Sequence, residues 1–379
     1  MNQALKHLLL LLIMPLTVAQ AAERPGFPAF NWNKVPVYQM FADNSRLLTD
    51  GEVTQISATS GFICIEKQHG THSLGGADLG TKHEIPRFKA LNPATKCLFY
   101  FNSAYAYPFT THTQIFRHGH VSEKDQRFIL KDPKTGELVH RANCYQFDVL
   151  VPEFRAWWSE TVGKCVRDTG ADGLFVDQMH GFVWLRPTKS GEIATAQADM
   201  MRMAKQAIGK DKILLLNNGA DIPALFEIGD AFMFEHYTAD LLTKEAILKD
   251  WELMKKISQA GKISVWRIGL ETENPDVAKA GGSPQSMNAT YEELSKIQMP
   301  YYLAAFLIGA QPNSYFQYGW GWTLQDGALV DYPELRKPLG KPLGDFIRSA
   351  PDGWIFKRDF EHASVWLDLN SREGKVDWK

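Results

Sequence analysis

The sequence predicts an α/β chain of the (β/α)8 TIM-barrel class, with a small β appendage at the C-terminus. Two observations favour this class: eight short apolar runs recur along the chain, and helical patterns separate most of them. Apolar runs without alternation are typical of strands buried on both faces of a parallel sheet. The predicted strands are Val37–Phe41, Phe62–Glu66, Cys97–Phe101, Leu174–Gln178, Ile213–Asn217, Ala231–Glu235, Ile263–Arg267 and Ser314–Tyr318.

Apolar residues at three- and four-residue spacing predict four helices between these strands. The first begins at Pro152, a favourable first-turn residue, and the second ends at Gly209. The third follows an apolar stripe over Leu242–Ile257, and the fourth covers Tyr291–Ala310, where Pro300 is expected to interrupt it. A doubly wound open sheet is the alternative, but no strand is followed by a GxGxxG or P-loop motif.

Residues 1–21 match a secretory signal peptide. Lys6 provides a short cationic start, Leu8–Ile13 is an uninterrupted apolar run, and Ala19-Gln20-Ala21 fits the small-x-small cleavage rule. An uncleaved membrane anchor is the alternative, which the shortness of the apolar stretch disfavours. We therefore expect a secreted or periplasmic protein with no stable membrane insertion after cleavage of the signal.

Two segments lie outside the strand–helix repeat. Tyr105–Asn143 is a long connection after the third predicted strand, where barrel enzymes place substrate-contacting loops. We expect the barrel to occupy residues 22–350 and a small β-strand region to occupy residues 351–379. The strands predicted in that region are Trp354–Arg358, Ala363–Leu369 and Val376–Trp378.

Composition narrows the class of partner. The 41 Lys and Arg residues against 43 Asp and Glu give a net charge of −2, so no basic excess points to nucleic acid. The 11 tryptophans offer flat faces that suit either sugar stacking or core packing. None of the cysteines has the CxxC spacing of a zinc site, and export is consistent with either disulfides or buried thiols. The four cysteines are Cys64, Cys97, Cys144 and Cys165.

Active sites of barrels lie at the C-terminal ends of the strands. The residues that end the predicted strands include carboxylates, amides and an arginine, and tryptophans follow the last strand. A glycosidase needs such a set, because two carboxyl groups must flank the scissile bond and many hydroxyls need hydrogen-bond partners. The residues expected to bind substrate are Glu66, His69, Asn102, Tyr105, Asn217, Asn218, Tyr237, Arg267, Gln317, Trp320 and Trp322.

Asp177 and Glu235 are the candidate catalytic pair. Each ends an otherwise apolar run, where a charge needs a partner or a function, and their strands are two apart in the predicted barrel. Two structural alternatives remain open: Asp177 caps the following loop, or Glu235 forms a salt bridge with Arg267. Glu66, which precedes Lys67, is the competitor for either catalytic role.

An ordered series of motifs carries a family resemblance. It consists of Val35–Tyr38, Ile65–Gly70, Ala90–Pro93, Leu98–Asn102, Phe147–Asp148, Pro152–Trp158 and Gly170–Asp177. From about Trp32 to the C-terminal strands, the chain resembles the secreted barrel family known as hypothetical glycosyl hydrolases. Its fourth and sixth strands are also similar to those of retaining α-galactosidase barrels, where a strand-four Asp is the nucleophile and a strand-six Asp the acid/base.

The resemblance implies a carbohydrate-active enzyme with Asp177 as nucleophile and Glu235 as acid/base, although the sixth strand here ends in Glu rather than Asp. We expect a secreted glycoside hydrolase that cleaves a poly- or oligosaccharide with this carboxylate pair, with neither cofactor nor metal. A non-catalytic carbohydrate-binding barrel is the first alternative. A metal-dependent hydrolase that uses His118 and His120 is the second.

Overall fold

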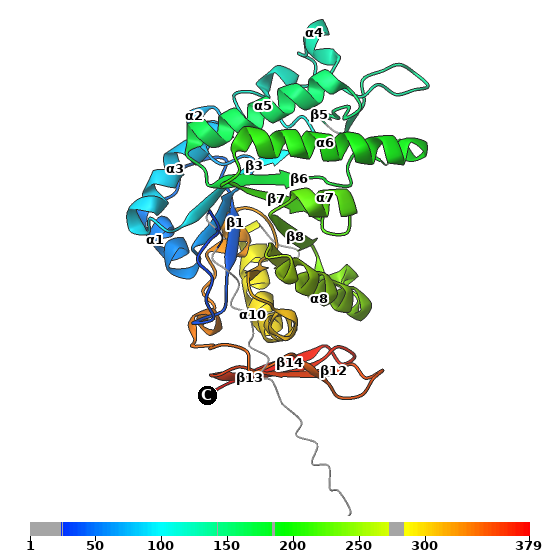
Figure 1. Cartoon of the computed structure of the whole chain (residues 1–379). Coiled ribbons are helices and arrows are strands. Elements are labelled where there is room, and N and C mark those ends of the chain that lie inside the picture. Colours follow the sequence, from blue (N-terminus) through cyan, green and yellow to red (C-terminus); the bar gives the residue numbers. More distant parts are fainter. Residues whose placement is uncertain (1–23, 25, 142, 184–185, 273–283) are drawn as a thin grey trace, which may run out of the picture.

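A computed structural model describes residues 24, 26–141, 143–183, 186–272 and 284–379; the predicted signal peptide lies outside them. Eight parallel strands form one sheet in the order β1-β2-β3-β6-β7-β8-β9-β10 (Figure 1). All eight predicted strands are confirmed within one or two residues at their ends. Their bounds are β1 Tyr38–Phe41, β2 Phe62–Ile65, β3 Lys96–Asn102, β6 Gly173–Asp177, β7 Ile213–Asn217, β8 Ala231–His236, β9 Ile263–Ile268 and β10 Ser314–Tyr318.

The sheet closes into a barrel where β1 meets β10, a junction called the seam below. A parallel bridge joins Val37 to Phe316 at the seam, in place of the continuous ladders between the other neighbours. Farther along, the side-chain amide of Gln317 donates to the carbonyl oxygen of Met40 at 3.3 Å. A side chain thus supplies one of the hydrogen bonds that join the first and last strands.

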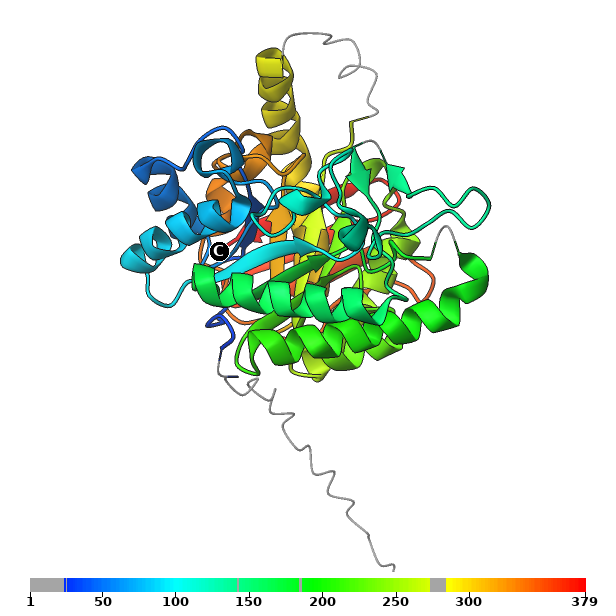
Figure 2. The same ribbon diagram turned by 90° about the horizontal axis from the view of Figure 1, so that it is seen from above.

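Helices cover the outside of the barrel, and α5 and α6 pack along each other on one side (Figure 2). The four predicted helices are confirmed as α5, α6, α8 and α10, whereas α1 and α3 were not predicted. α1 buries only Val53 and Ile56, and α3 contains Gly80 and Pro86. The helices are α1 Asp50–Thr59, α2 Thr71–Leu74, α3 Ala77–Leu91, α5 Pro152–Thr169, α6 Ser190–Ile208, α7 Pro223–Ile228, α8 Lys244–Gln259 and α10 Pro284–Gly309.

The expected interruption at Pro300 is wrong, because α10 continues through this residue. Pro300 is exposed, whereas Tyr301 and the nine residues after it are buried between the barrel and the C-terminal sheet. Tertiary packing of that segment outweighs the loss of one backbone hydrogen bond. Propensity at one residue is therefore a weaker guide than the apolar pattern around it.

The long connection after β3 carries short elements of its own. Phe116 and Phe128 pack on Trp157 of α5, which holds the loop against the barrel. The elements in this connection are η1 Gln114–Phe116, α4 Glu123–Gln126, β4 His140–Arg141 and β5 Cys144–Tyr145. Other short turns of helix are η2 Pro187–Lys189, η3 Ala239–Leu241, η4 Leu324–Ala328 and η5 Pro333–Arg336.

The C-terminal region is a four-stranded antiparallel sheet packed on α10 (Figure 1). The three predicted strands are confirmed, and a two-residue strand precedes them. The bounds are β11 Ile347–Arg348, β12 Ile355–Asp359, β13 Ala363–Asp368 and β14 Glu373–Trp378. Along β12, Phe356 and Arg358 are buried against the body of the protein while Lys357 and Asp359 are exposed.

Two findings bear on the predicted thiols and on membrane contact. All four cysteines are buried free thiols, so the disulfide alternative is not realised.

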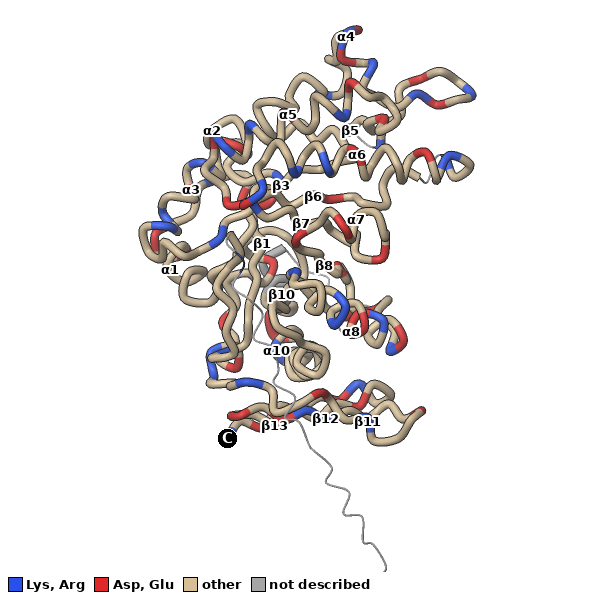
Figure 3. The backbone as a smooth tube through the Cα atoms, in the orientation of Figure 1, with Lys and Arg blue, Asp and Glu red and all other residues tan. Residues whose placement is uncertain are grey.

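Within the described ranges, no helix has both the length and the apolar character needed to cross a bilayer. Lys and Arg alternate with Asp and Glu over the outer helices (Figure 3), in keeping with the balanced net charge.

Arg358 fastens the C-terminal sheet to the end of α10. Its guanidinium donates to the carbonyl oxygens of Leu307, Ile308 and Ala310 at 3.1, 3.0 and 2.5 Å, and to that of Gly344 at 3.2 Å. The side chain is only 4% exposed. It therefore satisfies carbonyls that the end of a helix leaves without partners.

We predict that Arg358→Met lowers the free energy of unfolding by about 3 kcal/mol, because it strands several buried carbonyls. Urea unfolding monitored by circular dichroism measures the change. Lys357→Met, on the exposed face of the same strand, is the matched control and should change the value by less than about 0.5 kcal/mol. Equal effects of the two substitutions would contradict the role given to Arg358.

Candidate active site

The interior of the barrel is apolar below its C-terminal end. Because side chains of a strand alternate between its two faces, every second residue points inward. These inward residues form one buried cluster: Tyr38, Met40, Phe62, Cys64, Leu98, Tyr100, Phe175, Ile213, Leu215, Ala231, Met233, Ile263, Val265 and Tyr315.

The next inward position on seven of the eight strands carries a polar residue, and Ala42 takes the place on the first strand. These seven residues form the top layer of the barrel interior, at the end that we call the mouth. They are Glu66, Asn102, Asp177, Asn217, Glu235, Arg267 and Gln317. All seven were predicted as site residues, and the alternation of the strands brings them into one layer.

Asp177 is held by three side chains of the mouth. The Tyr100 hydroxyl donates to its Oδ2 at 2.6 Å, and the Asn102 amide donates to the same oxygen at 3.3 Å. The Asn217 amide and the Gln178 backbone N–H donate to its Oδ1 at 3.0 and 2.8 Å. Together these donors fix the orientation of the Asp177 carboxylate.

The amide nitrogen of Asn217 joins the two predicted catalytic carboxylates. It donates to Asp177 Oδ1 at 3.0 Å and to Glu235 Oε2 at 2.5 Å. Because both bonds share one nitrogen, the two oxygens are no more than 5.5 Å apart, the sum of the two lengths. Asn218 adds a second link, since its Oδ1 accepts from the backbone N–H of Glu235 at 2.9 Å.

The environment of Glu235 favours its protonated form. Burial raises the pKa of this carboxyl above its usual range, and the charge of Asp177 raises it further. The hydrogen bond from Asn217 and the positive charges of Arg267 and Lys67 act in the opposite direction but do not cancel the effect. Glu235 thus combines a raised pKa with partial exposure at the mouth.

Glu66 is a third carboxylate below the same mouth. It is 1% exposed and pairs through Oε1 with the ammonium group of Lys67, while its Oε2 has no partner among the described residues. Burial raises the pKa of Glu66 to about 7, opposed by Lys67 and assisted by the charges of Asp177 and Glu235. The pair is largely buried, because the side chain of Glu66 is 1% exposed and that of Lys67 is 25% exposed.

Arg267 is fully buried, and its guanidinium donates to the backbone carbonyls of His236, Tyr237 and Gly321 at 3.0–3.2 Å. Burial lowers the pKa of Arg267 to about 10, and the charge of Glu235 partly offsets this shift. The guanidinium lies over the ring of Trp322, 4.3 Å from its centroid. Arg267 therefore fixes the loops that carry the exposed Tyr237 and the mouth-facing Trp322.

A shallow groove runs from the mouth along the loop after β3. Tyr105 lines it together with Tyr107 and Phe109, whose rings stack with centroids 5.3 Å apart. Lys67 and Tyr100 line its inner end. The groove thus leads from the partners of Asp177 to an aromatic wall.

Three predicted substrate-binding residues have internal partners instead. His69 is fully buried: Asp43 N donates to its Nδ1 at 3.0 Å, so the ring proton is on Nε2, 3.1 Å from Glu84 Oε1. Gln317 bonds across the seam to the β1 backbone. Trp320 packs beside Tyr291 of α10 rather than beside Arg267.

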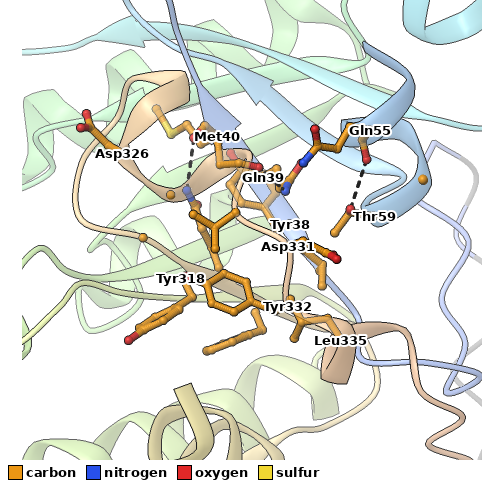
Figure 4. Close-up of a pocket in the computed structure, with 18 of the residues that line it drawn as sticks. Tyr38, Gln39, Met40, Gln55, Thr59, Tyr318, Asp326, Asp331, Tyr332 and Leu335 are labelled. Atoms are coloured by element: carbon orange, nitrogen blue, oxygen red, sulfur yellow. Dashed lines mark hydrogen bonds between the residues drawn. The ribbon is translucent and has the colours of Figure 1, made fainter. Parts of the chain in front are cut away.

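Outside the mouth, a pocket of about 170 Å³ lies against the seam, between α1 and the segment that follows β10 (Figure 4). Gln39, Gln55, Asp331 and Tyr332 are among its lining residues. Neither predicted catalytic carboxylate lines it. Its position reflects the incomplete pairing of β1 with β10.

The predicted metal motif does not come together as a metal site. The His118 ring stacks on Tyr145 and meets the ring of His140, with centroids 5.2 and 4.7 Å away. In the part of the chain that the structure describes, no group of three or more His, Cys, Asp or Glu residues could hold a metal ion. Neither His118 nor His120 is among the residues that line the groove beside Asp177.

Sequence reasoning missed Tyr100 and Lys67. Tyr100 lies two residues before Asn102 on a predicted strand, so the alternation already pointed it inward below the top layer. Lys67 stands next to Glu66, and no pattern in the sequence shows that its side chain lies at the mouth. Its pKa is raised because the charges of Glu66 and Asp177 outweigh the opposing effect of burial.

The raised pKa of Glu66 predicts a pH-dependent effect on stability. The folded protein holds this proton more tightly than the unfolded chain, so stability from this group is greatest below pH 4.5 and falls until about pH 7. Relative to the parent, Glu66→Gln should therefore gain up to about 3 kcal/mol between pH 4.5 and 8. Urea unfolding across this range measures the difference, and a difference that does not change with pH would contradict the assignment.

Comparison with known proteins places the chain in a family. A family model described as hypothetical glycosyl hydrolase family 15 matches residues 89–364, well over half of the chain. No curated protein sequence matches. An α-amylase from Geobacillus thermoleovorans shares the fold with a TM-score of 0.52 at 12% identity, over 89% of this chain and 87% of that one. A maltogenic α-amylase from Thermotoga neapolitana gives 0.50 at 12% identity, over 90% and 87%. On the family match, the chain belongs to hypothetical glycosyl hydrolase family 15.

Proposed function

We propose that this protein is an exported retaining glycoside hydrolase that cleaves a poly- or oligosaccharide with Asp177 and Glu235. The observation that carries the proposal is the shared hydrogen-bond donor, which keeps an oxygen of one carboxylate within 5.5 Å of an oxygen of the other. Retaining enzymes place their two carboxyl groups about 5–5.5 Å apart, and inverting enzymes about 6.5–9.5 Å. Membership of a glycosyl hydrolase family supports the substrate class.

Asp177 is the nucleophile in this proposal. The donors from Tyr100, Asn102 and Asn217 hold its orientation without occupying every lone pair. In the first step a carboxylate oxygen bonds to the anomeric carbon while the glycosidic C–O bond breaks. The product is a glycosyl ester of Asp177.

Glu235 is the acid/base. Its raised pKa keeps a proton available for the leaving oxygen in the first step. The resulting carboxylate then takes a proton from water, whose oxygen attacks the anomeric carbon and breaks the ester bond. The second step restores ionised Asp177 and protonated Glu235, so the cycle is balanced.

Aromatic side chains around the mouth suit the sugar rings that this reaction requires. Tyr237 is 53% exposed, and Trp322 lies across the mouth against the Arg267 guanidinium. Tyr107 and Phe109 extend the aromatic surface along the groove. These faces support binding of a saccharide with more than one residue.

We predict that Asp177→Ala and Glu235→Ala each lower turnover by about three orders of magnitude or more on a saccharide that the parent hydrolyses. The substrate is found by reducing-sugar release from a polysaccharide panel. Azide then separates the roles: with an activated aryl glycoside, Asp177→Ala should form a glycosyl azide of inverted configuration and Glu235→Ala one of retained configuration.

Asp172→Asn, at the opposite end of β6, is the control for effects on folding and should keep parental turnover. Full turnover by Asp177→Ala would remove the nucleophile assignment. Binding of saccharides without cleavage by the parent would select the carbohydrate-binding barrel instead.

A second prediction concerns pH. Because Glu235 must donate a proton and its pKa is raised, kcat/KM of the parent should fall on the alkaline side at a pH above the usual range of a glutamate. Glu235→Gln should remove this alkaline limb from its residual activity. A limb that persists unchanged in Glu235→Gln would assign it to another group.

A further inference from the structure

Lys67 is the charged group of the mouth that the proposed reaction leaves without a role. It is the second residue after β2, and its side chain is 25% exposed. The ammonium group lies 5.4 Å from the centroid of the Tyr100 ring and 6.0 Å from that of Trp322. The hydroxyl of that Tyr100 donates to Asp177, so the ammonium group stands beside the carboxylate that would react.

The ammonium group has donors to spare. It carries three N–H groups, and within the described part of the chain Glu66 Oε1 is its one hydrogen-bond acceptor. Lys67 also lines the groove that leads to Tyr107. Partly buried donors need acceptors, and a ligand at the mouth would supply them.

Glu66 forms its hydrogen bond with Lys67 and is too deeply buried to contact a ligand. Its side chain is 1% exposed, and its second oxygen is enclosed with no partner among the residues that the structure describes, an arrangement that costs free energy. Its one hydrogen bond goes to the ammonium group, which it both fixes and neutralises. The ammonium group of Lys67 therefore lies beside Asp177, and the carboxylate of Glu66 balances its positive charge.

The charges of the mouth balance when Glu66 is ionised, above about pH 7. Lys67 and Arg267 are then positive, Glu66 and Asp177 are negative, and a protonated Glu235 adds no charge. An acidic sugar on Asp177 would add a negative charge to a mouth whose two cations are already matched by two carboxylates. An uncharged sugar would meet free N–H donors for its hydroxyl oxygens.

Building on the proposed function, we propose that Lys67 is a specificity-determining residue that donates hydrogen bonds to hydroxyls of an uncharged sugar bound at Asp177. Glu66 acts as its positioning residue and offsets its charge, so that acidic sugars are not selected. The substrate class is therefore a neutral poly- or oligosaccharide rather than a polyuronide.

Binding to the full chain tests this assignment. The Glu235→Gln variant mimics the uncharged, protonated acid, so it slows turnover strongly without changing the charge balance. Calorimetry at pH 8, where Glu66 is ionised, uses neutral hexose oligomers of several linkages and the C6-oxidised uronate counterpart of each. We expect the best neutral oligomer to bind about tenfold or more tightly than its oxidised counterpart.

Two further substitutions in this variant should act in different ways. Lys67→Met should weaken binding of the neutral oligomer about tenfold or more, because hydrogen bonds from a charged donor are lost. Glu66→Gln should tighten binding of the oxidised oligomer about tenfold, because it exposes the charge of Lys67. A merely structural role of the pair would weaken binding of both oligomers alike.

Lys89→Met is the matched control. Lys89 is 26% exposed and pairs with Asp172 at 2.6 Å, at the opposite end of the barrel, so its loss should leave binding within twofold. The proposal is overturned if oxidised oligomers bind as well as neutral ones, if no oligomer binds, or if Lys67→Met binds normally. If Asp177→Ala keeps its turnover, the proposed catalytic role of Asp177 is wrong. The binding results would still test the role of Lys67.

Discussion

The closed apolar interior of the barrel is the constraint on which the rest of the structure depends. Fourteen inward side chains fill it up to the level of Tyr100, Phe175 and Met233, so the residues above them rest on a buried, mainly apolar floor. Carboxylates placed there lose solvation and must find donors or hold a proton. Asp177 finds donors, whereas Glu235 and Glu66 acquire raised pKa values.

The polar layer above this floor is organised as linked pairs. Asn217 uses both N–H groups of its amide on the two central carboxylates, so neither can move without the other. Lys67 and Arg267 lie near the same Trp322 ring, and they have different kinds of partner. Lys67 has an ionic partner in Glu66, and Arg267 is held by carbonyl oxygens.

Much of this arrangement could be predicted from the sequence, because apolar runs and the alternation of strands are local patterns. They located all eight strands, and they identified the seven polar residues of the top layer. Contacts between residues that are far apart in the sequence could not be predicted from these local patterns. His69 resembled a mouth residue until Asp43 and Glu84 were found on its two ring nitrogens, and Lys67 resembled a surface lysine until its surroundings were known. Contacts of this kind depend on loops whose paths leave no periodic signal.

The seam between β1 and β10 has a consequence for how the chain reaches its native state. Val37 and Phe316 bracket almost the whole barrel sequence, so their bridge closes a longer loop than the pairing of any other two neighbouring strands. Closing this loop costs more conformational entropy than any other contact in the sheet, and few hydrogen bonds between β1 and β10 offset that cost. Folding would therefore proceed as a growing curved sheet whose last event is the joining of its edges, and unfolding would begin at the same place. Side-chain hydrogen bonds such as that of Gln317 then stabilise the contact between the two edges of the sheet.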